Sequence, residues 1–152
     1  MKLVLFVLLV TSMAFSDGCK KDSEAITSIK ASTLSGTWEL RQLQGGMMPA
    51  ETYPAGNGNR LTFTGNKYER YRNGSLEKRG TFALVMDTTV KESVGLQLPA
   101  GQFTTRIIYD DDVNATKVFI DLQQDKLHLL SGFFPTDGGS RLEYEKIADT
   151  QQ

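Results

Sequence analysis

The 152-residue chain has one cysteine, Cys19, and one histidine, His128. A single cysteine excludes an intramolecular disulfide, so the folded part must be held together by its hydrophobic core. Zinc sites built from several cysteine or histidine ligands are excluded as well. Because such ligands are missing, we expect no metal ion, and we expect no other cofactor.

The chain also lacks an apolar run of about 20 residues, the length that a membrane-spanning helix needs.

A strong charge of one sign is also missing. The formal net charge is −1, and the basic pair Lys78-Arg79 is too small to form a positive surface. Nucleic-acid binding depends on such a surface, so we expect no nucleic-acid partner. The hydrophobic fraction of 39% and the charged fraction of 23% are typical of a globular domain.

Recognisable catalytic motifs are absent from the sequence. It has no Gly-x-Ser-x-Gly elbow, no His-Glu-x-x-His pair and no phosphate-binding loop. His128 stands between Leu127 and Leu129, so strand alternation predicts that it points to the opposite face, into solvent. The remaining enzymatic hypothesis is that acidic residues, such as Glu143 and Glu145, act in catalysis. We expect no catalytic residue and no enzymatic activity.

Two other features have alternative interpretations. The cluster Asp110-Asp111-Asp112 with Asn114 could hold Ca²⁺, but it lacks the alternation and glycine of an EF-hand loop. These residue types are also common in turns, and we favour a solvated turn. The segment 133–135, Phe-Phe-Pro, is either an exposed contact patch or a place where one ring enters the core and the other caps the barrel end. We favour the second interpretation.

The first 18 residues have the layout of an export signal. Lys2 precedes the uninterrupted apolar run Leu3–Val10, and Ser16-Asp17-Gly18 is small and polar. The run is too short for a stable spanning helix. The sequence thus predicts a signal peptide over 1–18 and an exported protein. A polar tether follows over 19–33.

From Leu34 onward, short alternating segments are separated by turn residues such as Asn73-Gly74. Strands are predicted at 34–44, 59–64, 67–72, 76–86, 102–110, 116–122, 126–132 and 140–147. Eight sequential strands with one apolar face most simply form an up-and-down barrel. We expect an all-β, eight-stranded antiparallel barrel over 34–148 and a short tail at 149–152. Two long connections, 45–59 and 87–101, are candidates for function, and the second has room for a helical turn at 89–94.

The segment 15–22, Phe-Ser-Asp-Gly-Cys-Lys-Lys-Asp, resembles the lipobox of bacterial lipoproteins of the Bacteroidetes type. The resemblance implies that Cys19 is lipidated and becomes the first mature residue. Two or more acyl chains give stable anchoring, so the partner would be a membrane. The protein would then be an outer-membrane lipoprotein that faces the periplasm or the cell surface.

The segment 34–40, Leu-Ser-Gly-Thr-Trp-Glu-Leu, is similar to the Gly-x-Trp opening strand of lipocalins. It is most similar to the short lipocalin-like domains of Bacteroidetes lipoproteins, and the similarity extends over about 34–147. The resemblance implies a structural signature of Gly36, Trp38 and Arg141. In it, Trp38 closes one barrel end and Arg141 packs across the indole ring.

Such a barrel has room for its own side chains or for one small ligand. We expect a small apolar ligand to enter at the end opposite Trp38, near Met47, Met48 and Tyr53. Large inward-facing residues are the expected walls: Leu40, Leu61, Phe63, Tyr68, Phe82, Leu84, Tyr109 and Tyr144. The alternative is a non-catalytic interaction module with a filled barrel, which would be an accessory to an outer-membrane assembly and bind an envelope protein.

Overall fold

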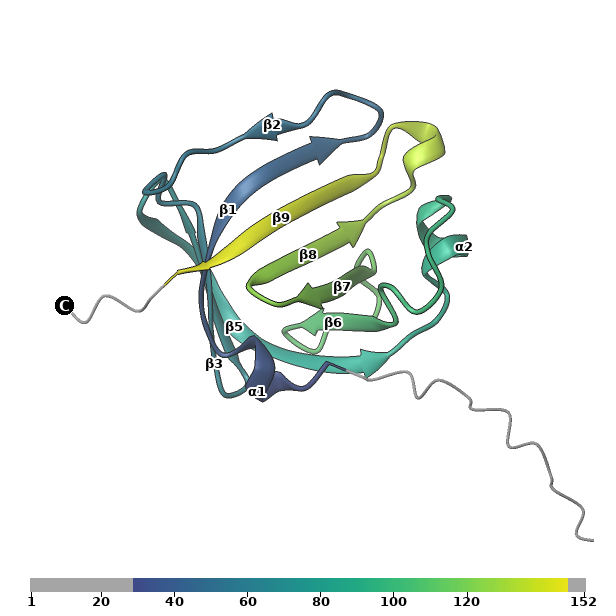
Figure 1. Ribbon diagram of the computed structural model, residues 1–152. Coiled ribbons are helices and arrows are strands. Elements are labelled where there is room, and N and C mark those ends of the chain that lie inside the picture. The colour runs from purple at the N-terminus through teal and green to yellow at the C-terminus, as the bar shows by residue number, and fades with distance from the viewer. Residues whose placement is uncertain (1–28, 148–152) are drawn as a thin grey trace, which may run out of the picture.

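The computed structural model describes residues 29–147, which form a closed antiparallel β-barrel (Figure 1). Its eight strands are β1 (Gly36–Gly45), β3 (Arg60–Thr64), β4 (Lys67–Arg72), β5 (Ser75–Met86), β6 (Thr105–Tyr109), β7 (Val118–Gln123), β8 (Lys126–Ser131) and β9 (Ser140–Ile147). The predicted signal peptide, Cys19 and the C-terminal tail lie outside the described residues.

The barrel closes because β1 pairs with two strands, β3 on one side and β9 on the other. Every other barrel strand pairs with its neighbours in sequence, and all of these pairings are antiparallel. The predicted eight-stranded up-and-down barrel is therefore confirmed. The turn between β4 and β5 also follows the sequence, since Asn73 and Gly74 both have positive φ, at 50° and 81°. The type I′ hairpin turn requires this conformation at both central positions.

Both long connections contain secondary structure. The loop after β1 includes a short strand, β2 (Glu51–Thr52), which pairs with β1 and was not predicted. The helical turn foreseen in the second connection is present as α2 (Val90–Val94). A further short helix, α1 (Ala31–Leu34), covers the end of the expected tether and Leu34, where the first strand was predicted to begin. Within residues 29–147, no helix has the length and apolar character needed to cross a bilayer.

A second hydrophobic cluster lies outside the barrel. Phe119 on β7 and Leu130 on β8 have neighbours in the barrel core, Ile120 and Leu129, so alternation directs them outward. They pack with residues of α2, of the following loop and of the 3-10 turn η1 (Phe134–Thr136): Val90, Val94, Phe103 and Phe134. Figure 1 shows α2 outside the barrel. The second long connection therefore covers an outer face of the sheet.

The Phe-Phe-Pro segment contributes to this outer cluster. Phe134 is buried there, whereas Phe133 remains partly exposed. One ring of the pair therefore enters a hydrophobic core, as the favoured interpretation expects, but this core is the outer cluster and not the barrel interior. The sequence shows that an apolar side chain is buried, but it does not show which of two clusters buries it.

Trp38 closes one end of the barrel together with α1. Its side chain is 1% exposed, and its indole Nε1 donates a hydrogen bond of 2.8 Å to the carbonyl of Leu34. Leu34, the last residue of α1, is fully buried against the same cluster. The predicted burial of Trp38 is confirmed.

The predicted partner of Trp38 is wrong. Lys146 lies opposite Trp38 in the β1–β9 register, and its Nζ is 5.3 Å from the centre of the indole ring. Arg141 lies opposite Gln44 and is exposed. Because β9 runs antiparallel to β1, its first residues lie far from the Trp38 end and its last residues lie beside it.

Asp87 fixes the end of β5 to the loop before β7, and its contribution to stability should depend on pH. Its carboxylate lies 2.9 Å from Lys117 Nζ and accepts hydrogen bonds from the backbone and side chain of Thr89. Burial opposes ionisation, but the bonds from Thr89 and Lys117 outweigh it and lower the pKa of Asp87 from 3.8 to about 2.

A lowered pKa stabilises the fold at pH values above the unfolded-state pKa, and this stabilisation disappears as the pH falls through the folded-state pKa. We expect Asp87→Asn to lower the free energy of unfolding by about 2 kcal/mol at pH 7. The difference from wild type should shrink between about pH 4 and pH 2. Urea unfolding across this range measures it, and a difference that does not change with pH would contradict the assignment.

Candidate functional site

The interior of the barrel has a packed half and a hollow half. Side chains fill the half next to Trp38, where the rings of Phe63 and Phe82 meet edge to face with centroids 4.9 Å apart. Leu61, Ile107 and Leu127 complete this packing and are almost fully buried. Toward the opposite end, where β1 leaves the barrel at Gly45, the core cluster borders a cavity.

A cavity of about 630 Å³ occupies the hollow half. Its apolar and aromatic lining consists of Leu40, Leu43, Tyr53, Tyr71, Tyr109, Val118, Leu142 and Tyr144, and its polar lining consists of Asn59, Arg70, Arg72, Asn73, Glu77 and Ser131. Known small-molecule sites have volumes of about 300–1,000 Å³ and the same combination of apolar walls and a few polar groups. The cavity is the candidate functional site.

The structure divides the predicted wall residues between the two halves. Four of them line the cavity: Leu40, Tyr53, Tyr109 and Tyr144. These four also belong to the core cluster or pack against it, whereas the others do so without lining the cavity: Leu61, Phe63, Tyr68, Phe82 and Leu84. Alternation identified the inward face correctly, but it does not show how far along the barrel the packing extends.

Met47 and Met48 do not line the cavity. Their side chains are 75% and 69% exposed, so their predicted place at its mouth is not supported by contacts. Both residues precede β2, which holds the following segment along β1. Tyr53, directly after β2, donates its backbone N–H to the carbonyl of Arg41 at 2.8 Å and lines the cavity.

A buried carboxylate fixes the rest of this loop. Glu39 accepts hydrogen bonds from the backbone N–H groups of Gly56 at 2.9 Å and Gly58 at 3.4 Å, and from Arg41 at 2.7 Å. Burial opposes ionisation of Glu39, but these donors lower its pKa below the ordinary value. The loop that carries Tyr53 is therefore a fixed part of the wall.

Arg70 is the charged residue whose position was not foreseen. It follows Tyr68 by two positions on β4, and Tyr68 is buried in the core, so alternation points Arg70 inward. Its guanidinium carbon lies 5.9 Å from the centre of the Tyr109 ring. The signal was present in the sequence, since the alternation that predicts the inward position of Tyr68 also predicts that of Arg70.

Two tyrosines lie close to Arg70 in the cavity wall. Burial raises the pKa values of Tyr109 and Tyr144 above the ordinary value, and the nearby Arg70 only partly opposes this. Both phenols are therefore neutral at physiological pH and able to donate hydrogen bonds. The hydroxyl of Tyr109 is buried and has no hydrogen-bond partner among the described residues.

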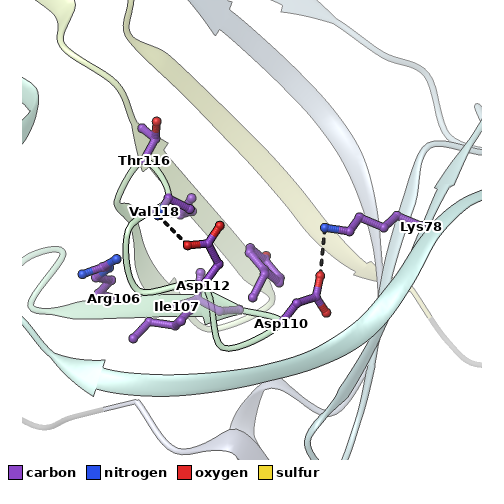
Figure 2. Close-up of a pocket in the computed structure, with 10 residues that line it drawn as sticks. Lys78, Arg106, Ile107, Asp110, Asp112, Thr116 and Val118 are labelled. Atoms are coloured by element: carbon purple, nitrogen blue, oxygen red, sulfur yellow. Dashed lines mark hydrogen bonds and ion pairs between the residues drawn. The ribbon is translucent and has the colours of Figure 1, made fainter.

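A smaller hollow of about 240 Å³ lies beside the cavity and shares Tyr109 and Val118 with it. Figure 2 shows Lys78 and Arg106 on opposite sides of this hollow, with Lys78 paired to Asp110. It lies where β6 and β7 separate, because their pairing ends at Ile107 and Val118.

The acidic cluster at this hollow forms a turn. Asp110 and Asp111 both have positive φ, and the Asp112 side chain accepts hydrogen bonds from the backbone N–H groups of Asn114 and Ala115. Asp110 accepts from Tyr68 at 3.0 Å and from the N–H of Thr81 at 3.1 Å, and it pairs with Lys78. Among residues 29–147, no group of three metal-ligating side chains converges.

His128 points outward from β8, as alternation predicts, but it is not in solvent. It is 8% exposed because it lies between β7 and β9, opposite Asp121 and Glu143. Burial lowers its pKa, although Glu143 opposes this, and its Nδ1 is 3.8 Å from the Glu143 carboxylate. The prediction of exposure was wrong because side chains from neighbouring strands cover the outer face there.

The chain was compared with protein-family models, with curated proteins and with solved structures. No family model, no curated protein and no solved structure matches it.

Proposed function

We propose that this protein is a lipid-anchored binding protein of the cell envelope, with a small, largely apolar ligand held in the hollow half of the barrel. The single observation that carries the binding role is the cavity of about 630 Å³. Its walls combine aromatic rings with aliphatic side chains, and burying such surface on a ligand is favourable by about 25 cal/mol per Å².

The packed half of the barrel supports the same proposal. A domain of this size needs a solid core, and the cluster around Trp38, Phe63 and Phe82, which extends to Leu40 and Tyr144 in the cavity wall, supplies one. The walls of the cavity are held by the sheet and by the Glu39 contacts, so little ordering would be needed on binding. The alternative, an interaction module, assumed a filled barrel, and the cavity favours the carrier.

The envelope location rests on the sequence. The export signal over 1–18 and the lipobox resemblance around Cys19 support a mature protein that begins at Cys19 with acyl chains attached. The barrel would then stand at a membrane surface, where apolar molecules are abundant. The protein has no catalytic role in this proposal.

Titration with phenylnaphthylamine, an uncharged probe that fluoresces in apolar surroundings, tests the binding role. The protein would be the chain from residue 19 with Cys19→Ser, which contains every described residue. We expect saturable binding to this protein. Ser131→Trp should weaken binding about tenfold, because Ser131 lines the cavity and an indole there would occupy the site.

Thr64→Trp is the matched control, since Thr64 is exposed at the end of β3 and faces away from the inward Phe63. It should bind the probe as wild type does, and far-ultraviolet circular dichroism should show that both variants keep the barrel. Absence of saturable binding, or equal binding by Ser131→Trp, would refute the carrier.

A further inference from the structure

We propose that the ligand is an anionic amphiphile whose acidic group binds Arg70 at the inner end of the cavity. This inference rests on the proposed binding function and adds the chemical class of the ligand. A carboxylate or sulfonate on an apolar or aromatic body has the required chemistry.

The first argument is the position of Arg70. In the sheet it lies opposite Leu61, which belongs to the packed core and is almost fully buried. Arg70 nevertheless lines the cavity, so it stands where the packed half ends and the hollow half begins. A ligand that entered from the open end would meet this guanidinium at the deepest point.

The second argument is that Arg70 has no acidic partner among residues 29–147. Glu77, the only acidic residue in the cavity lining, pairs with Arg72 at 2.7 Å. Asp110 pairs with Lys78 and accepts a hydrogen bond from Tyr68. The cavity lining contains two cations, Arg70 and Arg72, and one anion, Glu77, so its formal net charge is +1. A half-buried cation that loses hydration without gaining an ion pair attracts an anion.

The contact of Arg70 with Tyr109 does not replace an anion. At 5.9 Å from the ring centre, the guanidinium is at the outer limit of about 6 Å for a cation–π interaction. Apart from this contact with Tyr109, which partly opposes the rise in the pKa of the phenol, the N–H donors of Arg70 have no partner among residues 29–147. A carboxylate can accept two of them in parallel, the geometry for which a guanidinium is best suited.

The neighbouring tyrosine fits an anionic group as well. The hydroxyl of Tyr109 is a neutral donor without a partner, directly beside Arg70. With the anion bound to Arg70, a small movement of the arginine side chain would bring one oxygen of the anion within hydrogen-bond distance of the Tyr109 hydroxyl. The body of the ligand would then extend toward the mouth along Leu43 and Leu142, which lie opposite each other on β1 and β9.

Two fluorescent probes that differ by one sulfonate group test this inference. Anilinonaphthalene sulfonate has the ring system of phenylnaphthylamine with an added sulfonate. Arg70→Met keeps most of the side-chain volume and removes the charge. We expect it to weaken binding of the sulfonate probe by tenfold to about a hundredfold, the range of hydrogen bonds to charged groups. Binding of the uncharged probe should change by no more than about twofold.

Two further variants separate a specific contact from a loss of charge. Arg79→Met removes an exposed arginine from β5 outside the cavity and should leave the affinity for both probes unchanged. Arg70→Lys retains the charge but loses the parallel pair of N–H donors, so its affinity for the sulfonate probe should lie between those of the wild type and Arg70→Met. Decanoate and naphthoate should compete with this probe. The stronger competitor shows whether the apolar part of the natural ligand is aliphatic or aromatic.

The outcomes distinguish this inference from the function on which it rests. If neither probe binds the wild-type protein, the binding function itself fails. If both probes bind and Arg70→Met weakens them equally or not at all, the cavity binds ligands but the anionic class is wrong. Lack of competition by both carboxylates would also overturn the inference.

Discussion

Replacing Trp38 with alanine is expected to lower the free energy of unfolding by about 3–5 kcal/mol. The indole is 1% exposed in the core, and its removal would leave a large void against Leu34 and Leu61. It would also leave the carbonyl of Leu34 without its 2.8 Å hydrogen bond. Small domains have only about 5–15 kcal/mol of stability, so the midpoint of urea unfolding should fall sharply.

Two variants on β9 provide the comparison for Trp38→Ala. Lys146→Met removes the cation over the indole and should cost about 0.5–1 kcal/mol, as expected for a partly exposed cation–π contact. Arg141→Met should change the stability by less than about 0.5 kcal/mol, because Arg141 is exposed and far from Trp38 in the register. A larger cost for Arg141→Met than for Lys146→Met would contradict the packing described here.

The second large effect is expected for Cys19→Ser, which should abolish lipidation. Cys19 is the only cysteine in the chain, so no other thiol could accept a diacylglyceryl group. Metabolic labelling with a fatty-acid probe in a lipoprotein-processing bacterium should mark the wild-type protein and leave the variant unlabelled. Membrane fractionation should show the same loss, since stable anchoring requires two or more acyl chains.

The control for this experiment lies in the predicted tether. Lys20→Ala lies next to the modified residue and should still be labelled. Equal labelling of the wild-type protein and Cys19→Ser would refute lipidation at this residue. Such a result would leave the barrel and its cavity unaffected, because they depend only on residues 29–147.

The strands were predictable because their signals are local. Alternation in 82–86 and the Asn73-Gly74 pair each act within a few residues, and together they give strand limits and hairpin turns. Closure of the sheet also followed, since eight sequential strands with one apolar face have few other ways to bury it. The short strand β2 was missed because Glu51–Thr52 has no alternation of its own and pairs through its neighbour β1.

Features that depend on distant pairing were not predictable. The contact of Lys146 with Trp38 follows from the register of the first and last strands, which includes an irregularity between Leu40 and Gln42. The burial of His128 depends on side chains from two adjacent strands. Sequence alternation gives the direction of these residues but not what covers them.

The same limit applies to the cavity. Leu40 and Phe82 have the same inward pattern and belong to the same core cluster, yet only Leu40 also lines the cavity. The tilt of the strands decides which inward residues meet, and no short segment encodes it. Arg70 was missed for a different reason, because large apolar side chains, and not a charged one, were expected on the inward wall.

A crystal structure of the protein with phenylnaphthylamine bound would test the central claim, that the barrel holds a ligand in its hollow half. The account predicts density for the probe between Leu40, Tyr109 and Tyr144, above an unchanged core around Trp38. Density for the probe on the outer surface alone, with the side chains of Tyr53 and Arg70 filling the cavity, would contradict it.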